Sequence, residues 1–170
     1  MRLILAILVT LGLATPASAG EAFELVTKDP EPIAAISFTD RDGNEATLDR
    51  YRGRLVVLNL WATWCVPCRE EMPALDRLQA ALGTDAVAVV ALAVDRGGAQ
   101  AVDVFLAQTP VEHLDIVIDQ SARSARQLRA PGLPTTLVLD REGREIARVL
   151  GLALWDSPAA IERIRALAGS

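Results

Sequence analysis

Apolar and polar positions change their spacing several times along this chain, and each change predicts a different element. Residues 54–60 (RLVVLNL) and 86–94 (AVAVVALAV) are apolar runs of strand length, which predicts two buried strands. Between them, apolar positions from 72 to 82 recur at helical spacing, so a helix with one apolar face is expected. Pro73 lies inside this helix and is expected to kink it.

The remaining patterns alternate between strand and helix. Short strands are expected at 36–38 and 46–48, as a hairpin around the turn Asp42-Gly43-Asn44. Further strands are expected at 114–118, 135–139 and 144–150, and helices at 99–107, 121–128 and 157–167, with Ser121 and Ser157 as N-caps. This order predicts an α/β fold whose sheet is covered by helices and is largely parallel, with an antiparallel edge.

Composition adds limits on function. The chain has 170 residues, of which 51% are hydrophobic and 23% charged, and these values suit one globular domain. The formal net charge is −5, so a nucleic-acid-binding role has no basic surface to start from.

The N-terminus resembles an export signal. Arg2 is followed by an apolar run over 3–14 and by small residues at 17–19, which predicts a signal peptide over 1–19 and a periplasmic protein. The apolar run is shorter than the roughly 20 residues of a membrane span, but an uncleaved membrane anchor stays an alternative. Residues 20–32 are expected to form a flexible leader, and 33–170 the folded domain.

Cys65 and Cys68 are the only two cysteines. They could form a structural disulfide, half of a metal site, or a dithiol that cycles between two redox states. A disulfide this short closes a tiny loop and removes little entropy from the unfolded chain. A structural zinc site needs four ligands, and beyond the two thiols the chain offers one distant imidazole, His113, to which no role is assigned. Two thiolates could still hold Cu(I).

The position of the pair favours the redox dithiol. It lies between the strand at 54–60 and the following helix, with Pro67 suited to the first helical turn. Free N–H groups at a helix start stabilise a thiolate. Cys65 is therefore expected to be the exposed nucleophile, and Cys68 the more buried resolving thiol.

The motif Trp64-Cys65-Val66-Pro67-Cys68 resembles the active site of the thioredoxin superfamily, in particular its exported TlpA/ResA-like thiol–disulfide oxidoreductases. The resemblance covers about 33–168 and implies a thioredoxin-like fold: a central mixed sheet flanked by helices, with an N-terminal β-hairpin extension. Other segments that share it are 59–61, Pro73, Gly132-Leu133-Pro134-Thr135-Thr136, 140–143 and 155–157.

This resemblance also implies a place where partners bind. The bond before Pro134 is expected to be cis and to face the cysteines, which leaves the backbone of Leu133 free to pair with a partner peptide. Trp61 and Trp64 are expected to wall the site and to shield Cys68. The residues expected to contact a partner are Trp64, Val66, Pro67, Leu133 and Pro134.

Asn59 stands where cytoplasmic thioredoxins typically have a buried aspartate that handles the proton of the resolving thiol. An amide cannot do this. Glu71, three residues after Cys68 and at the spacing of a ResA-like glutamate, is a candidate proton shuttle. The alternative is a solvated Glu71 that pairs with Arg69 or Arg77.

The resemblance implies disulfide exchange with protein substrates, without a bound cofactor, because sulfur carries the electrons. Since Val66-Pro67 lacks the histidine of strongly oxidising members, a reductant is favoured, which a membrane electron donor re-reduces. Some members of the resembling family serve cytochrome c maturation, which is therefore a candidate role. A copper-handling protein and a disulfide-forming oxidant remain alternatives. A peroxidase of the peroxiredoxin class is disfavoured, because its cysteine motif is absent from the sequence.

Overall fold

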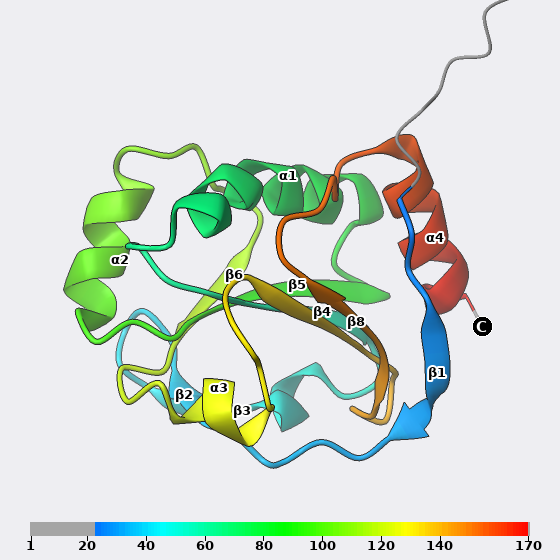
Figure 1. The fold of residues 1–170 in the computed structure, drawn as a ribbon, viewed down its shortest axis with the longest axis horizontal. Helices are drawn as coiled ribbons and strands as arrows, with labels where there is room; N and C mark the ends of the chain where they lie inside the picture. Colours follow the sequence, from blue (N-terminus) through cyan, green and yellow to red (C-terminus); the bar gives the residue numbers. More distant parts are fainter. Residues whose placement is uncertain (1–22, 170) are drawn as a thin grey trace, which may run out of the picture.

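One sheet of eight strands separates two hydrophobic cores in the computed structural model, which describes residues 23–169 (Figure 1). The strands are β1 (Thr27–Glu31), β2 (Ser37–Thr39), β3 (Glu45–Thr47), β4 (Leu55–Trp61), β5 (Val87–Ala93), β6 (Asp115–Ile118), β7 (Thr135–Leu139) and β8 (Glu145–Leu150). Their spatial order is β1-β8-β7-β4-β5-β6-β2-β3. The two apolar runs of the sequence therefore form adjacent central strands, β4 and β5.

Helices cover both faces of this sheet. They are α1 (Val66–Leu82), α2 (Gly98–Leu106), α3 (Arg123–Gln127) and α4 (Pro158–Ala168), with a 3₁₀ helix η1 over Leu48–Tyr51. The helices α1 and α4 lie on one side of the sheet and α3 on the other (Figure 1). Apolar side chains of α1, α2 and α4 belong to one core, whereas η1 and the end of α3 contribute to the other. Because strand side chains alternate between faces, Val57 and Trp61 of β4 join the first core, and Leu58 and Leu60 the second.

The fold class predicted from the sequence is confirmed. The α/β architecture, the central mixed sheet and the N-terminal β2–β3 hairpin are all present. Ser157 caps α4 as expected, accepting a hydrogen bond from the backbone N–H of Ala160. Pro73 lies inside α1, which continues to Leu82.

The prediction of a largely parallel sheet is wrong. Two of the seven strand pairings, β4–β5 and β5–β6, are parallel, and the other five are antiparallel. The chain leaves β6 through the short α3 and enters β7 on the other side of β4, running antiparallel to it. Local apolar patterns specify that a strand forms, but not which strand becomes its neighbour.

The predicted leader over 20–32 also differs from the structure. Residues 27–31 form β1, which pairs antiparallel with β8 at the edge of the sheet. All five of its residues are exposed, so the period-2 burial signal of a strand is missing from the sequence. The predicted signal peptide over 1–19 lies outside the described residues.

The predicted cap at Ser121 is wrong as well. The helix α3 begins later, at Arg123, and its N-cap is Ala122 in the left-handed region with φ of 53°. The carboxylate of Asp119 accepts hydrogen bonds from the backbone N–H groups of Ser121 and Ser124 instead. Asp119, four residues before the first residue of α3, thus takes the place of the expected serine N-cap.

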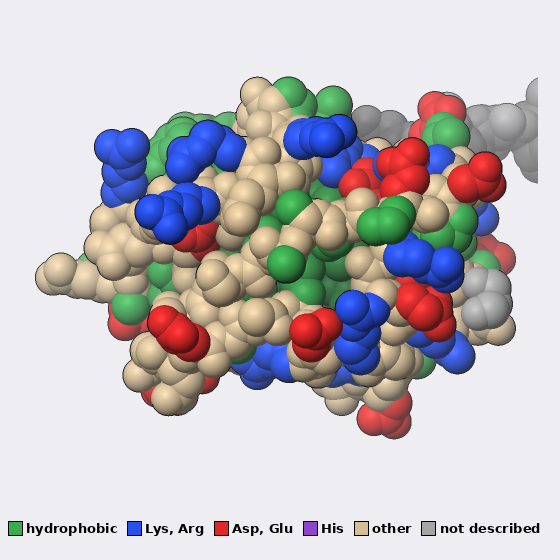
Figure 2. Space-filling view, turned by 90° about the horizontal axis from the view of Figure 1, so that it is seen from below, with side chains coloured by type: hydrophobic (Ala, Val, Ile, Leu, Met, Phe, Trp, Pro, Cys, Tyr) green, Lys and Arg blue, Asp and Glu red, His purple; other side chains and the backbone are tan. Residues whose placement is uncertain are grey.

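Basic and acidic side chains are interspersed on the face seen from below the molecule (Figure 2). This mixture agrees with the modest net charge and offers no continuous basic surface on that face. Across residues 23–169, the helices are too short or too polar to be candidates for a membrane span.

Arg148 on β8 connects the sheet to the end of α3. Its guanidinium donates to both carboxylate oxygens of Glu145, at 2.9 and 2.7 Å, and to the carbonyls of Leu128 and Arg129, at 2.9 and 3.3 Å. Lys28 of β1 also contacts Glu145, at 3.3 Å. The pair of Glu145 and Arg148 therefore connects β8 to β1 through the carboxylate and to the end of α3 through the guanidinium.

We expect Arg148→Met to lower the free energy of unfolding by about 2 kcal/mol, because it removes the two hydrogen bonds from Arg148 to the Glu145 carboxylate and leaves two carbonyls without this donor. Urea unfolding measures the change. Arg52→Met, which breaks the exposed pair with Asp49, is the control and should cost less than about 0.5 kcal/mol. Equal losses in the two variants would contradict the structural role of Arg148.

Candidate active site

The cysteine pair lies where β4 passes into α1. Cys65 is the N-cap of α1, and the backbone N–H of Cys68 donates to its sulfur at 3.3 Å. The two cysteines form a disulfide, with Cα atoms 5.3 Å apart. Once the disulfide is reduced, the first N–H groups of α1 and its dipole stabilise negative charge on the Cys65 sulfur.

The relative burial of the cysteines follows the expected order, but Cys65 is buried rather than exposed in the disulfide form. Cys65 is 5% exposed and Cys68 1%. Both belong to the apolar cluster under α1, and the backbone N–H of Cys65 donates a hydrogen bond to the carbonyl of Ala62. Cys65 is therefore the cysteine that a partner can approach more easily, and Cys68 is closed to solvent.

The two tryptophans of the motif lie in different environments. Trp61 is completely buried and its ring packs against Phe105, with centroids 5.0 Å apart. Trp64 is 68% exposed. Trp61 is thus a core residue below the site rather than part of its wall, and Trp64 presents an apolar surface beside the disulfide.

The peptide bond between Leu133 and Pro134 is cis, as the resemblance implied. Thr135 pairs with Leu60 in the register of β7 and β4. Pro134 therefore lies next to the carboxyl end of β4, where the segment to Cys65 begins. Of the other predicted contact residues, Val66 and Pro67 are exposed and Leu133 is half-buried.

Glu71 is buried rather than solvated, with 2% of its surface exposed. The indole Nε1 of Trp155 donates to its Oε1, and its Oε2 has no hydrogen-bond partner among the described residues. Burial disfavours the charged form and raises the pKa of Glu71 to about 8. The alternative of a surface pair with Arg77 is wrong, because Arg77 binds Asp156 instead.

Asn59 is buried on the same face of the sheet as α1, by the alternation along β4. Its Nδ2 donates to Oγ1 of Thr136 on β7, at 2.9 Å. This neutral amide joins two strands under the site. Glu71, three residues after Cys68 on α1, is a buried ionisable side chain.

Asp95 was not predicted as a site residue. It follows β5, and its Oδ2 accepts hydrogen bonds from both N–H and Oγ1 of Thr63, at 2.9 and 2.6 Å. This contact holds the turn that delivers Cys65. Its sequence signal is its position: an aspartate at the carboxyl end of the parallel strand next to β4, where sites of α/β proteins usually form.

His113 has a structural contact that the sequence did not indicate. Its Nδ1 lies 2.9 Å from Oδ2 of Asp76 on α1, and Oδ1 of Asp76 accepts the backbone N–H groups of 112–114. The aspartate thereby fastens the segment before β6 to α1. Among residues 23–169, His, Cys, Asp and Glu side chains form no group of three or more suited to a metal ion.

Comparison with known proteins agrees with this geometry. The chain matches the Redoxin family over residues 26–160. It is 30% identical to the thiol-disulfide oxidoreductase ResA of Bacillus cereus over 113 residues, which are 66% of this chain and 64% of that protein. It is 37% identical to the thioredoxin-like protein YneN of Bacillus subtilis over 121 residues, 71% of this chain and 70% of YneN. The match thus spans slightly less than two thirds of ResA.

Solved structures show the same fold. A putative thiol:disulfide interchange protein DsbE from Chlorobium tepidum superposes with a TM-score of 0.74 at 27% identity, covering 84% of this chain and 99% of that one. StoA from Bacillus subtilis superposes with a TM-score of 0.63 at 20% identity, covering 81% and 98%. With the disulfide, the cis proline and the buried glutamate in these positions, the chain belongs to the Redoxin family and is a ResA-like member of the thioredoxin superfamily.

Proposed function

We propose that this protein is a thiol–disulfide oxidoreductase that exchanges the Cys65–Cys68 disulfide with disulfides or dithiols of partner proteins. The observation that carries the proposal is the position of the disulfide. It closes across the first turn of α1, at the end of a central strand and at the same sheet edge as Pro134. A structural disulfide needs none of these neighbours.

The reaction is a two-electron exchange. In the reduced protein, the Cys65 thiolate attacks one sulfur of a partner disulfide, which forms a mixed disulfide and releases the partner's other sulfur as a thiolate. Cys68 then loses its proton and attacks the sulfur of Cys65. The Cys65–Cys68 disulfide closes, and the partner leaves with both sulfurs reduced.

Glu71 is proposed to exchange the proton of Cys68. A buried carboxyl whose pKa is raised to about 8 lies near the ordinary pKa of a thiol. Proton transfer between groups of similar pKa needs little driving force, which suits a general acid or base. The exposed side chains of Trp64, Val66 and Pro67, with the segment of Leu133 and Pro134, are proposed to contact the partner.

The proposed direction is reduction, in the periplasm. The signal-like residues 1–19 support export, and Val66-Pro67 supplies no charge that would favour the reduced form of the pair. A membrane electron donor would then return the disulfide to the dithiol. The cysteines of apocytochrome c are a candidate substrate, because the resemblance includes proteins of cytochrome c maturation.

A redox titration of the purified protein, followed by tryptophan fluorescence, tests this proposal. Trp64 adjoins the disulfide, so the signal should change with its redox state. A reversible two-electron midpoint near or below about −250 mV is expected for a reductant, and one near −120 mV would mark an oxidant. Absence of a reversible transition, with stoichiometric copper in the purified protein, would replace the proposal with copper handling.

A further inference from the structure

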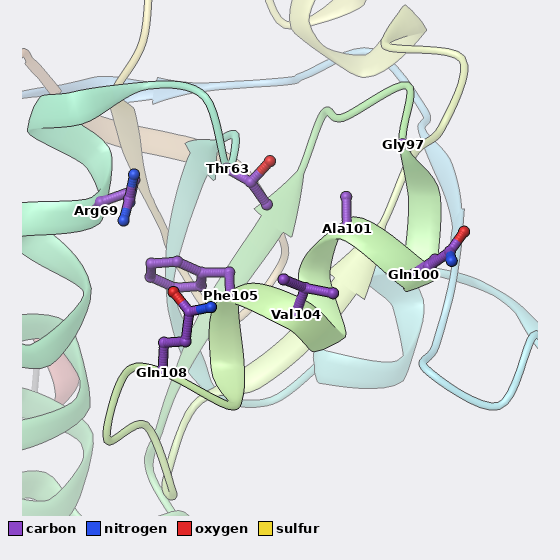
Figure 3. A pocket seen from close by; sticks show the side chains of 8 residues that line it. All are labelled: Thr63, Arg69, Gly97, Gln100, Ala101, Val104, Phe105 and Gln108. Carbon is purple, nitrogen blue, oxygen red and sulfur yellow. The ribbon is translucent and has the colours of Figure 1, made fainter.

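A groove runs between α1 and α2 (Figure 3). It consists of two hollows, of about 450 and 360 Å³, which share Arg69 and Phe105 as lining residues. We call it the Arg69 groove. Its remaining lining residues are Thr63, Gly97, Gln100, Ala101, Val104 and Gln108 in the larger hollow, and Val66, Glu70 and Thr109 in the smaller one.

The groove adjoins both cysteines along the chain. Thr63 lies two residues before Cys65, Val66 directly follows Cys65, and Arg69 directly follows Cys68. A partner chain whose sulfur reaches Cys65 continues on both sides of that sulfur. One of those sides can follow the segment of Pro134, and the Arg69 groove is then available to the other.

The groove combines an apolar base with one cation that has no ionic partner. Phe105 lies at its base, and Val104 stands exposed on its rim. The guanidinium of Arg69 lies 5.8 Å from the centre of the Phe105 ring, and the two side chains point toward each other across the hollow (Figure 3). Within residues 23–169, Arg69 forms no ion pair.

The acidic side chains near the groove do not form an ion pair with Arg69. Asp95 is committed to Thr63 and to the backbone N–H of Gly97. Glu70 is an exposed lining residue of the smaller hollow and makes no ion pair in the described part of the chain. The ring of Phe105 removes water from one face of the Arg69 guanidinium. The N–H groups of the guanidinium stay free to donate two parallel hydrogen bonds to one carboxylate.

We propose that the Arg69 groove binds the partner segment next to the reacting disulfide, and that Arg69 selects partners with a carboxylate side chain in that segment. This specificity rests on the proposed function. The apolar base accepts an aliphatic stem, and the guanidinium pairs with the carboxylate at its end. Arg69 is thus a specificity-determining residue that touches the partner and not the reacting sulfurs.

Two disulfide-bonded peptides that differ only in Glu or Gln at positions flanking the cysteines test the proposal. The purified reduced protein should reduce the Glu peptide about fivefold faster, measured as the second-order rate constant of a single turnover at low salt, the size expected of one well-placed ion pair. Arg69→Gln should remove this preference. Arg69→Glu should react faster with a third peptide, which carries Lys at the same positions, than with the Glu peptide. Arg123→Gln, at an exposed arginine on α3, is the matched control and should keep it.

A small uncharged disulfide, bis(2-hydroxyethyl) disulfide, separates this proposal from the proposed function. If the unaltered protein fails to reduce it, the oxidoreductase function itself is overturned. If it is reduced but the Glu and Gln peptides react equally fast, the specificity of the groove is overturned. A loss of rate with the small disulfide in Arg69→Gln would likewise overturn it, since Arg69 would then act on the cysteines and not on the partner.

Discussion

Cys65→Ser is expected to reduce disulfide exchange to the uncatalysed rate, whereas Cys68→Ser should stop the reaction at a mixed disulfide with the partner. The reason is the difference in their positions. Cys65, the N-cap of α1, is the less buried of the two cysteines, and Cys68 is closed to solvent. Without Cys65 no thiolate reaches a partner, and without Cys68 no thiol releases the one that is bound.

Non-reducing electrophoresis and intact mass measure the trapped species, and peptide reduction measures turnover. The trapped adduct should disappear on addition of dithiothreitol. Serine replaces a sulfur with an oxygen of similar size, so both variants should retain the circular dichroism spectrum of the reduced protein. Turnover by Cys65→Ser, together with no adduct in Cys68→Ser, would reverse or remove the assigned roles.

Glu71→Gln is expected to change how the stability of the protein depends on pH. In the unfolded chain this carboxyl ionises near its ordinary pKa of 4.5, whereas in the folded protein burial raises the pKa to about 8. Between these values the folded state holds a proton that the unfolded state has lost. Stability from this group is therefore full below about pH 4.5, falls as the pH rises to 8, and then levels off.

The loss across this window amounts to about 3–5 kcal/mol, because one unit of pKa shift corresponds to roughly 1.4 kcal/mol. Glutamine cannot ionise, and its carbonyl can still accept the indole N–H of Trp155. Urea unfolding at several pH values should therefore show a flatter profile for Glu71→Gln between pH 5 and 9. The exposed neighbour provides the control: Glu70→Gln should retain the profile of the unaltered protein.

The same substitution tests the proposed proton transfer. Resolution of the mixed disulfide by Cys68 should slow down in Glu71→Gln, most clearly near and below pH 8, where few thiols are ionised without help. Attack by Cys65 should keep its rate. If both steps keep their rates in the variant at every pH, Glu71 is a buried structural residue and not a proton carrier.

The sequence by itself determined the elements and the chemistry of the motif. Strands β4 and β5 are short apolar runs, and α1 has its apolar positions at helical spacing, so a window of a few residues contains the whole signal. The same holds for the cysteine pair at the start of a helix. The cis bond before Pro134 followed from a family motif of five residues.

Only the tertiary structure decided what each side chain meets. Glu71 and Trp155 are 84 residues apart along the chain, and their contact is what separates a buried proton carrier from a solvated surface charge. The burial of Trp61 depends in the same way on Phe105 from α2. The burial of a side chain and its pKa depend on neighbours from distant segments of the chain, so they cannot be predicted from a local sequence pattern.

The order of the strands and the surface proposed to bind a partner were likewise decided only by the tertiary structure. The exposed residues of β1 form a strand because β8 offers a free edge, and β7 runs antiparallel because α3 returns it beside β4. The Arg69 groove exists because α2 packs next to the start of α1. The sequence determined which groups carry the chemistry, and packing between distant elements determined which of them are covered, paired or left open to a partner.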